Sequence, residues 1–249
     1  MKGKLFEARN FVNEGSVDLL MAQKNRKFHI SFILLWIYEA LMFIALVTEI
    51  VDIFTTSNQG QVLLSIVEVL AGILLGFLPL WVGRWLRLNV PQQLYSFYVI
   101  FLFGSIYLGT FLHFYSVPYW DKMLHLVSSS LEVCLGLALL GALVAPQVYS
   151  KLSMVFVTFY GLCFAVFCGV LWEFYEFTCD SFGMNLQRYI LNGQVQVGRA
   201  ALMDTMTDLI AAFAGAFIFC VYLYLRLRKD PNKLQNFFFT SNQSATTRK

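Results

Sequence analysis

The chain has 249 residues, of which 58% are hydrophobic and only 13% are charged, whereas charged residues make up about a quarter of a typical soluble domain. Its mean hydropathy is +0.64. These values exclude a soluble globular domain, a disordered protein and a small disulfide scaffold, and they predict a protein that crosses a membrane several times. The net charge of +3 comes without a basic face or a nucleic-acid-binding motif, so we expect no nucleic-acid partner.

Six apolar segments reach the length of about 20 residues that a helix needs to cross a bilayer. We predict spans at approximately 30–54, 62–82, 95–115, 122–144, 152–178 and 201–225. The fold class is therefore all-α, a polytopic membrane protein with six transmembrane helices. Its predicted parts are a cytoplasmic N-terminal segment (1–28), a six-helix membrane domain (29–226) and a cytoplasmic basic tail (227–249). The first 28 residues are polar and charged, which favours a first span over a cleaved leader.

The lysines and arginines are divided very unevenly between the two sides of this topology. Fifteen lie on the side that holds both termini, and the other side holds only Lys122, Arg188 and Arg199. Because cytoplasmic loops carry the excess of positive charge, both termini are predicted to lie inside. We expect a multi-pass protein of the cell membrane, most consistent with a bacterial plasma membrane, with the lipid bilayer as its main partner.

Two further features concern packing and loops. Small residues on the last span, among them Gly215 and Ala216, predict a surface for close helix contact. The longest connection, Cys179–Ala200, faces outside in this topology. Long connections are often functional, so this one either caps a site or is a plain connector.

Acidic and histidine residues gather at the outer ends of the last three predicted spans. Each span carries one pair at a spacing of three or four residues, which places the pair on one helix face. The pairs are Asp121 with His125, Glu173 with Glu176, and Asp204 with Asp208. His113, on the third predicted span, is expected near the same end.

Several carboxylates cannot all stay ionised side by side in a low dielectric without compensation. Either some are protonated or a cation neutralises them. Oxygen-rich ligation with a histidine suits Mg²⁺, Mn²⁺, Ca²⁺ or iron, so we expect a divalent cation as cofactor. The predicted metal ligands are Asp121, His125, Glu173, Glu176 and Asp208. The predicted general base is Asp204, or whichever of Glu173 and Glu176 is not a ligand.

Structural explanations exist for each residue taken alone. Asp121 can stabilise the start of its helix, where acidic side chains are favourable. Glu173 and Glu176 can be solvated residues of the membrane interface, since Trp172 and Tyr175 suit the headgroup region. His125 can be a satisfied contact between helices. The joint occurrence on three helices at one level favours a functional site.

Three motifs carry a resemblance to known families. The order Asp121-Lys122-x-x-His125, Glu173-x-x-Glu176, Asp204-Thr205-x-x-Asp208 and a late Gly215-Ala216 resembles the YjdF-like family of uncharacterised bacterial inner-membrane proteins. A more distant similarity is to VanZ-like proteins, associated with glycopeptide resistance, which have Asn at the position of Asp208. The resemblance covers roughly residues 115–220. It implies a membrane location and the same six polar residues, and it implies no activity.

Three functions remain open at this point. The leading hypothesis is a cation-binding membrane protein, potentially a metal-dependent hydrolase acting on a lipid or envelope substrate. The second is a proton-coupled transporter or permease, whose intramembrane relay would consist of Glu39, Glu68, Glu132 and Asp208. The third is an envelope scaffold or resistance accessory, in which the polar residues fix the packing of the helices.

Overall fold

The computed structural model describes residues 30–145, 148 and 151–241. The predicted N-terminal segment, 1–28, and the last part of the predicted tail, 242–249, lie outside the described residues. Six helices of the described part are long and apolar enough to cross a membrane, so the chain is an all-α, multi-pass membrane protein. These helices are Ile30–Thr55, α2 (Gln59–Leu86), α3 with its continuation (Gln92–Phe111), α4 (Trp120–Leu143), α6 (Met154–Asp180) and α7 (Met203–Lys229).

The six predicted spans are confirmed, and every boundary lies within four residues of the approximate prediction. α2 begins earlier than expected because the Asn58 side chain caps it and accepts a hydrogen bond from the Gln61 N–H. α3 (Gln92–Leu102) passes into a π-helical segment, Phe103–Phe111, and the span ends there rather than at 115. His113 follows in a left-handed conformation, with φ of 58°, so it lies in a turn and not on a span.

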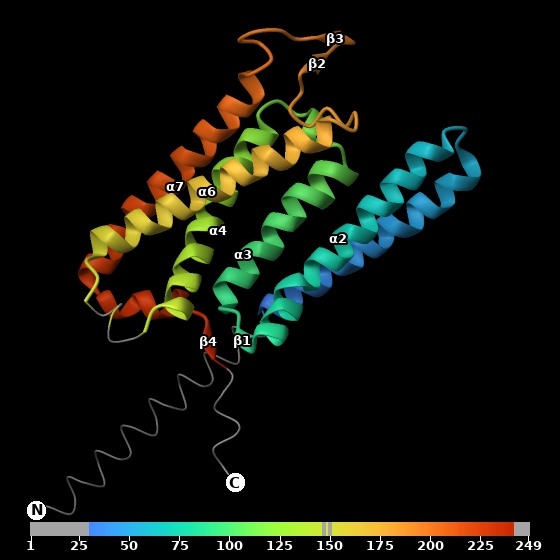
Figure 1. The fold of residues 1–249 in the computed structure, drawn as a ribbon. Coiled ribbons are helices and arrows are strands. Elements are labelled where there is room, and N and C mark those ends of the chain that lie inside the picture. The colour runs from blue at the N-terminus through green and yellow to red at the C-terminus, as the bar shows by residue number, and fades with distance from the viewer. Residues whose placement is uncertain (1–29, 146–147, 149–150, 242–249) are drawn as a thin grey trace, which may run out of the picture.

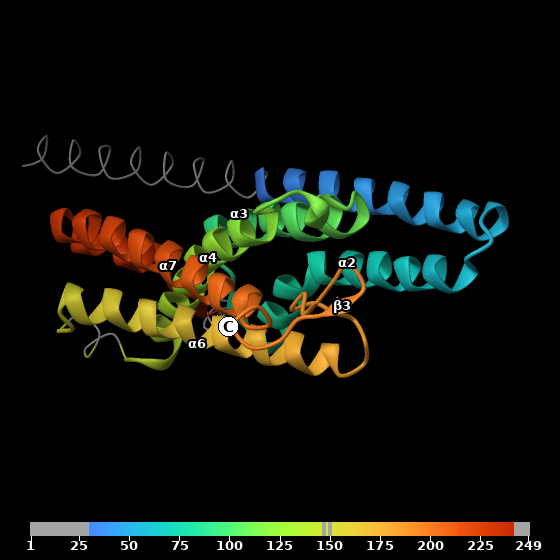
Figure 2. The same ribbon diagram turned by 90° about the horizontal axis from the view of Figure 1, so that it is seen from above.

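The helices form two groups with separate apolar cores (Figure 1). One core joins the first helix, Ile30–Thr55, to α2 and α3. The other joins α4, α6 and α7, and it also includes Leu234 and Phe238 from the stretch after α7. The view from above shows the first helix running beside α3 (Figure 2). In the second group, α4 is the helix that packs against α3.

In the first group, tyrosine hydroxyls bind the backbone of α2 around its proline. Pro79 has no N–H to donate to the carbonyl of Leu75, four residues earlier. The Tyr98 hydroxyl donates to that carbonyl at 2.9 Å, and the Tyr95 hydroxyl donates to the carbonyl of Gly76 at 3.0 Å. Since lipid offers no hydrogen-bond partner, these hydroxyls make a proline in a spanning helix acceptable.

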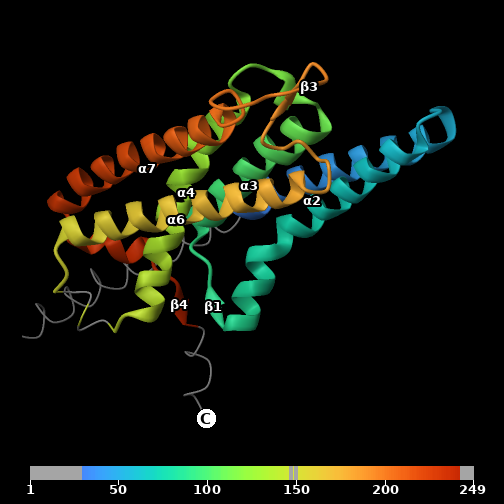
Figure 3. The same cartoon turned by 45° about the horizontal axis from the view of Figure 1, so that its top comes forward.

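In the second group, glycines bring the helices close together. A Cβ atom at Gly215 of α7 would meet the Leu126 carbonyl oxygen and the Ser129 hydroxyl of α4, so the predicted packing role of Gly215 is borne out. Gly136 of α4 faces Phe164 of α6 in the same way. Figure 3 shows α4, α6 and α7 lying side by side at this contact.

Short extended segments lie at both ends of the helices. At one end β2 (Ile190–Leu191) pairs with β3 (Gln194–Val195) in a hairpin. Its turn residues, Asn192 and Gly193, both have positive φ, as a type I′ turn requires. At the other end β1 (Leu88–Asn89) pairs with β4 (Thr240–Ser241), next to the short helix Pro231–Phe237.

Replacing Gly215 by alanine tests the close contact between α4 and α7. We expect Gly215→Ala to lower the free energy of unfolding by about 1–3 kcal/mol, because the new methyl group overlaps the backbone of α4. The control is Gly169→Ala, where the added Cβ would meet only Ala212 and Leu209 at 3.8 and 3.9 Å and helix propensity favours alanine. Denaturation in detergent micelles measures both. Equal stability of the two variants would contradict this packing.

Candidate functional site

A lysine occupies the centre of the polar cluster at the start of α4 and α7. The Lys122 Nζ lies 2.6 Å from Asp204 Oδ1, 2.8 Å from the Asp208 carboxylate and 3.3 Å from Asp121 Oδ2. Two of these acids come from the first turns of α7, while Asp121 precedes Lys122 on α4. The ammonium group therefore joins α4 to α7 through three carboxylates.

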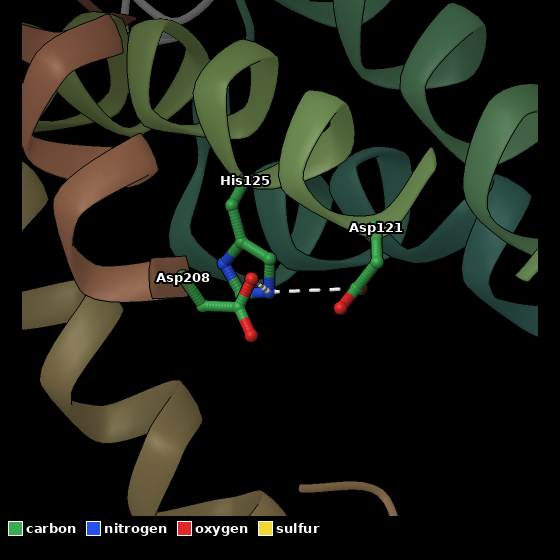
Figure 4. A group of neighbouring side chains, drawn as sticks. All are labelled: Asp121, His125 and Asp208. Carbon is green, nitrogen blue, oxygen red and sulfur yellow. Dashed lines mark ion pairs between the residues drawn. The ribbon is translucent and has the colours of Figure 1, made fainter. Parts of the chain in front are cut away.

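His125 completes this cluster one helical turn after Asp121. Its Nε2 lies 3.8 Å from Asp121 Oδ1 and 3.7 Å from Asp208 Oδ1. Figure 4 shows the imidazole between the two carboxylates, with each side chain pointing toward the others. One ligand atom from each of the three residues lies within 4.8 Å of the other two. These are three of the five predicted metal ligands.

The cluster is shielded to different degrees. The Asp208 side chain is 1% exposed, whereas those of Asp121 and Lys122 are 16% and 22% exposed. Asp208 therefore lies at the bottom of the cluster and Asp121 at its open side. A small ion or a water molecule would therefore reach Asp208 from the side of the cluster where Asp121 and Lys122 are exposed.

Glu173 and Glu176 lie on α6 next to this cluster and are both buried. Glu176 Oε1 accepts a hydrogen bond of 2.8 Å from Trp172 Nε1. Glu173 Oε2 lies 3.4 Å from Gln187 Nε2, and Glu173 interacts electrostatically with Asp204. Their interpretation as solvated interfacial residues is wrong, because helix packing covers both side chains.

The loop after α6 is held over the cluster by specific hydrogen bonds. The buried Asp180 carboxylate accepts from the backbone N–H groups of Leu186 and Gln187. The Gln187 amide then donates to Thr205 Oγ1 on α7 at 3.0 Å, in addition to its contact with Glu173 on α6. This favours the interpretation of the connection as a cap over a plain connector.

The same loop reaches the turn before α4. Arg188 Nη2 donates to the Tyr115 carbonyl oxygen at 3.0 Å. Burial of the Tyr115 phenol, with the nearby charges of Asp121 and Glu176, raises its pKa, and Arg188 partly offsets this. The hydroxyl of Tyr115 is thus a neutral hydrogen-bonding group beside the acidic cluster.

The structure separates the other predicted acids from the cluster. Glu39 is buried between the first helix and α2, where its carboxylate lies against Gly76. Glu132 lies two turns deeper on α4 than His125, and Glu68 is exposed on α2. Among the described residues, none of these three forms an ion pair with the cluster. The proposed relay is not a continuous chain of contacts there.

Lys122 is the residue that the sequence interpretation did not include in the site. It was counted only as a charge for orientation, although it lies inside the motif Asp121-Lys122-x-x-His125. An acid or histidine every three or four residues is an obvious pattern, whereas a single lysine in an interfacial position usually extends toward water. Asp180, the last residue of α6, follows Glu176 by four residues and so shares its helix face, a spacing signal that could have found it. Gln187 had no pattern of its own, because loop geometry alone brings it to the site.

The fold and the site together define a polytopic helical membrane protein with a lysine-centred carboxylate cluster at one end of its helices. A family model described as "Predicted membrane protein (DUF2238)" matches residues 34–229, so the chain belongs to this family. The match covers all six spanning helices apart from the first four residues of the first one. Neither a curated protein nor a solved structure matches the chain.

Removing the lysine tests its role as the counter-ion of the cluster. We expect Lys122→Met, studied with a chelator present, to lower the free energy of unfolding by about 3 kcal/mol, because buried carboxylates lose the one ammonium group that pairs with them among the described residues. The control is Lys233→Met, which breaks an exposed pair with Asp230 that contributes less than about 1 kcal/mol. Thermal unfolding in detergent measures both.

A double-mutant cycle with Asp208→Asn then isolates the pair. The double variant is expected to be less destabilised than the two single losses added together. Our assignment would be contradicted if Lys122→Met cost no more than Lys233→Met, or if the two substitutions were simply additive.

Proposed function

We propose that the cluster of Asp121, Lys122, His125, Asp204 and Asp208 binds a divalent cation at the outer face of the membrane. The observation that carries this proposal is the charge of the cluster. Three aspartates surround one lysine, which formally leaves two negative charges. No second lysine or arginine of the described chain forms an ion pair with these acids. A divalent cation supplies the missing charge.

The arrangement of ligand atoms supports the same conclusion. Cations such as Mg²⁺ and Ca²⁺ hold oxygen ligands at about 2.0–2.6 Å, so neighbouring ligand atoms are about 3–3.5 Å apart. The atoms of His125 lie 3.7 and 3.8 Å from those of Asp208 and Asp121. A contraction of these two distances by less than about 1 Å brings the His125 atom to the spacing that such a site needs. In this proposal the Lys122 ammonium holds the aspartates together without metal and moves aside when the ion binds.

The position of the cluster suggests which substrates it meets. The excess of lysine and arginine around the other helix ends supports placing both termini inside and the cluster outside. The motif resemblance to YjdF-like proteins, and more distantly to VanZ-like proteins, supports a bacterial plasma membrane. A cluster at this level would face the headgroups of outer-leaflet lipids and other envelope molecules.

Within this proposal the chemistry is metal-dependent hydrolysis of a lipid or envelope substrate. A bound divalent ion lowers the pKa of water and polarises phosphoryl or acyl oxygens. Glu173 Oε1 and Asp204 Oδ2 are buried, and neither accepts a hydrogen bond from a described residue. One of the two carboxylates would therefore take the proton of the attacking water. Glu176, which accepts a hydrogen bond from Trp172, would lie beside the bound ion without contacting it directly.

A second candidate, proton-coupled transport, has one observation in its favour. Glu39 Oε1 and Glu132 Oε2 are buried at depths well inside their helices, and neither has a hydrogen-bond partner among the described residues. Carboxyl groups in such positions are typical of proton-carrying sites. Their separation from the cluster makes hydrolysis at the outer face the better-supported function.

Metal analysis of the purified protein tests the cation site. We expect a stoichiometric divalent ion in the wild type, and its loss in Asp208→Asn and in His125→Ala. The matched control is Asp230→Asn, which removes an exposed acid at the opposite ends of the helices and should leave the metal content unchanged. Elemental analysis after purification in detergent gives the content directly.

If no variant changes the metal content, the metal proposal fails. If none of the proteins holds metal even after addition of Mg²⁺, Mn²⁺, Ca²⁺ or Fe²⁺, protonated carboxyls and the transport candidate are favoured. Loss of folding in Asp208→Asn without loss of any bound ion would instead support a purely structural network.

Hydrolysis is tested with metal-loaded protein and radiolabelled envelope lipids. We expect release of a labelled headgroup or acyl product by the wild type, and a decrease of about 10²-fold or more in Glu173→Gln if Glu173 is the general base. Metal content should be retained in that variant, which separates proton transfer from ligation. Unchanged product release in both Glu173→Gln and Asp204→Asn would exclude the two carboxylates as bases.

A further inference from the structure

A cavity with a largely apolar wall and one arginine lies at the opposite end of the molecule from the aspartate cluster. It lies between the first turns of α3, the last turns of α7 and the short helix Pro231–Phe237, and its volume is about 230 Å³. Leu94 and Phe97 of α3 face Phe219 of α7 and Phe237 across it, and Arg226 stands at its edge. Cys134 of α4 lies at its buried side.

A second cavity of about 360 Å³ adjoins the first along α3. The two share Gln93 and Phe97, and the second extends to Ile100 and to Ile30 at the start of the first helix. Gln92 also lines it, and the Gln92 Oε1 is buried without a hydrogen-bond partner in the described chain. We refer to these two neighbouring cavities together as the groove; its lining is polar near the helix ends and apolar toward the membrane interior.

The charged side chains at this end of the described chain are almost all positive. Seven cationic side chains occupy this end of the described chain, against a single acid, Asp230; they are Arg84, Arg87, Lys151, Arg226, Arg228, Lys229 and Lys233. Arg226 is oriented by its neighbour, because its Nη1 donates to the Tyr222 hydroxyl at 2.6 Å and its guanidinium lies 5.9 Å from the ring centre. No described carboxylate pairs with Arg226.

We propose that this groove, made by α3, α7 and the helix Pro231–Phe237, is a binding site for one anionic phospholipid. The phosphate lies against the Arg226 guanidinium and the Asn236 amide, and one acyl chain follows Phe97 toward Ile100. Basic pockets between helices at the membrane surface are typical sites for anionic headgroups. A free phosphate ion would leave the apolar wall of the groove without a binding partner. A neutral lipid would leave the charge of Arg226 without one.

The site is separate from the proposed cation site, which lies at the other ends of the same helices. An anionic lipid here would connect the two helix groups, since the groove is lined by α3 from one apolar core and by α7 from the other. The lipid would also hold Asn236 and Phe237 against α3.

Native mass spectrometry of the full chain tests this site with two lipids of equal chain length. The probes are dioleoyl phosphatidylglycerol and dioleoyl phosphatidylcholine, titrated into protein in detergent. We expect one phosphatidylglycerol to be retained in preference to phosphatidylcholine. Arg226→Gln should weaken this binding about fivefold, which corresponds to the roughly 1 kcal/mol expected of one basic side chain near anionic lipid. Leu94→Trp, which fills the cavity and keeps every charge, should weaken it as well.

The matched control is Arg228→Gln, which removes an exposed charge on the same helix that does not line the cavity. An equal loss in Arg228→Gln and Arg226→Gln would overturn the proposal in favour of diffuse attraction to a basic surface. Competition by inorganic phosphate at the same concentration would overturn the proposal in favour of a site for free phosphate. Equal retention of both lipids would overturn it as well, because the site would then not distinguish an anionic lipid from a neutral one. Unchanged unfolding temperatures of the lipid-free variants ensure that folding is not the cause.

Discussion

The ammonium group of Lys122 allows three aspartates from two helices to share one small volume at the end of the membrane domain. Asp208 is almost completely buried, and without a cation beside it α4 and α7 would separate or the acid would have to be neutral. The contact depends in turn on Gly215, two helical turns further along α7, where the absence of a side chain lets the helix lie against the α4 backbone. Backbone proximity at Gly215 and charge pairing at Lys122 therefore support each other.

The first helix, α2 and α3 are held together by a different kind of polar contact. Tyrosine hydroxyls donate to carbonyl oxygens of α2, and the carbonyl that Pro79 leaves without a donor is one of them. These are neutral hydrogen bonds, and they serve the backbone of a helix rather than a site. The charged side chains are instead concentrated on α4, α6 and α7, and all three recognisable motifs lie on these helices, between residues 121 and 208.

The helices were predictable because an apolar stretch of spanning length has few other structures available. Asp121, His125 and Asp208 were predictable as neighbours because their spacing places them on helix faces at one level. Lys122 was missed because sequence shows that a lysine lies near a helix end and not whether it turns inward. The hairpin after α6 had a readable signal, Asn192-Gly193, but Gln187 reaches Thr205 only through the fold of the loop that Asp180 anchors. The third span ends at Phe111, four residues before the approximate prediction, because the backbone turns there while apolar residues continue.

The two ends of the molecule differ in the sign of the charge that they leave unbalanced. At the start of α4 and α7 the surplus is negative and enclosed, so the group that compensates it has to be small and positive, such as a proton or a metal ion. Around the other helix ends the surplus is positive and open, and it adjoins an apolar groove, so the group that compensates it there can be large and amphiphilic. Since α7 carries Asp208 near one end and Arg226 near the other, this one helix contributes a charged side chain to each of the two places, and the opposite charges at its ends match the opposite charges of the two proposed ligands.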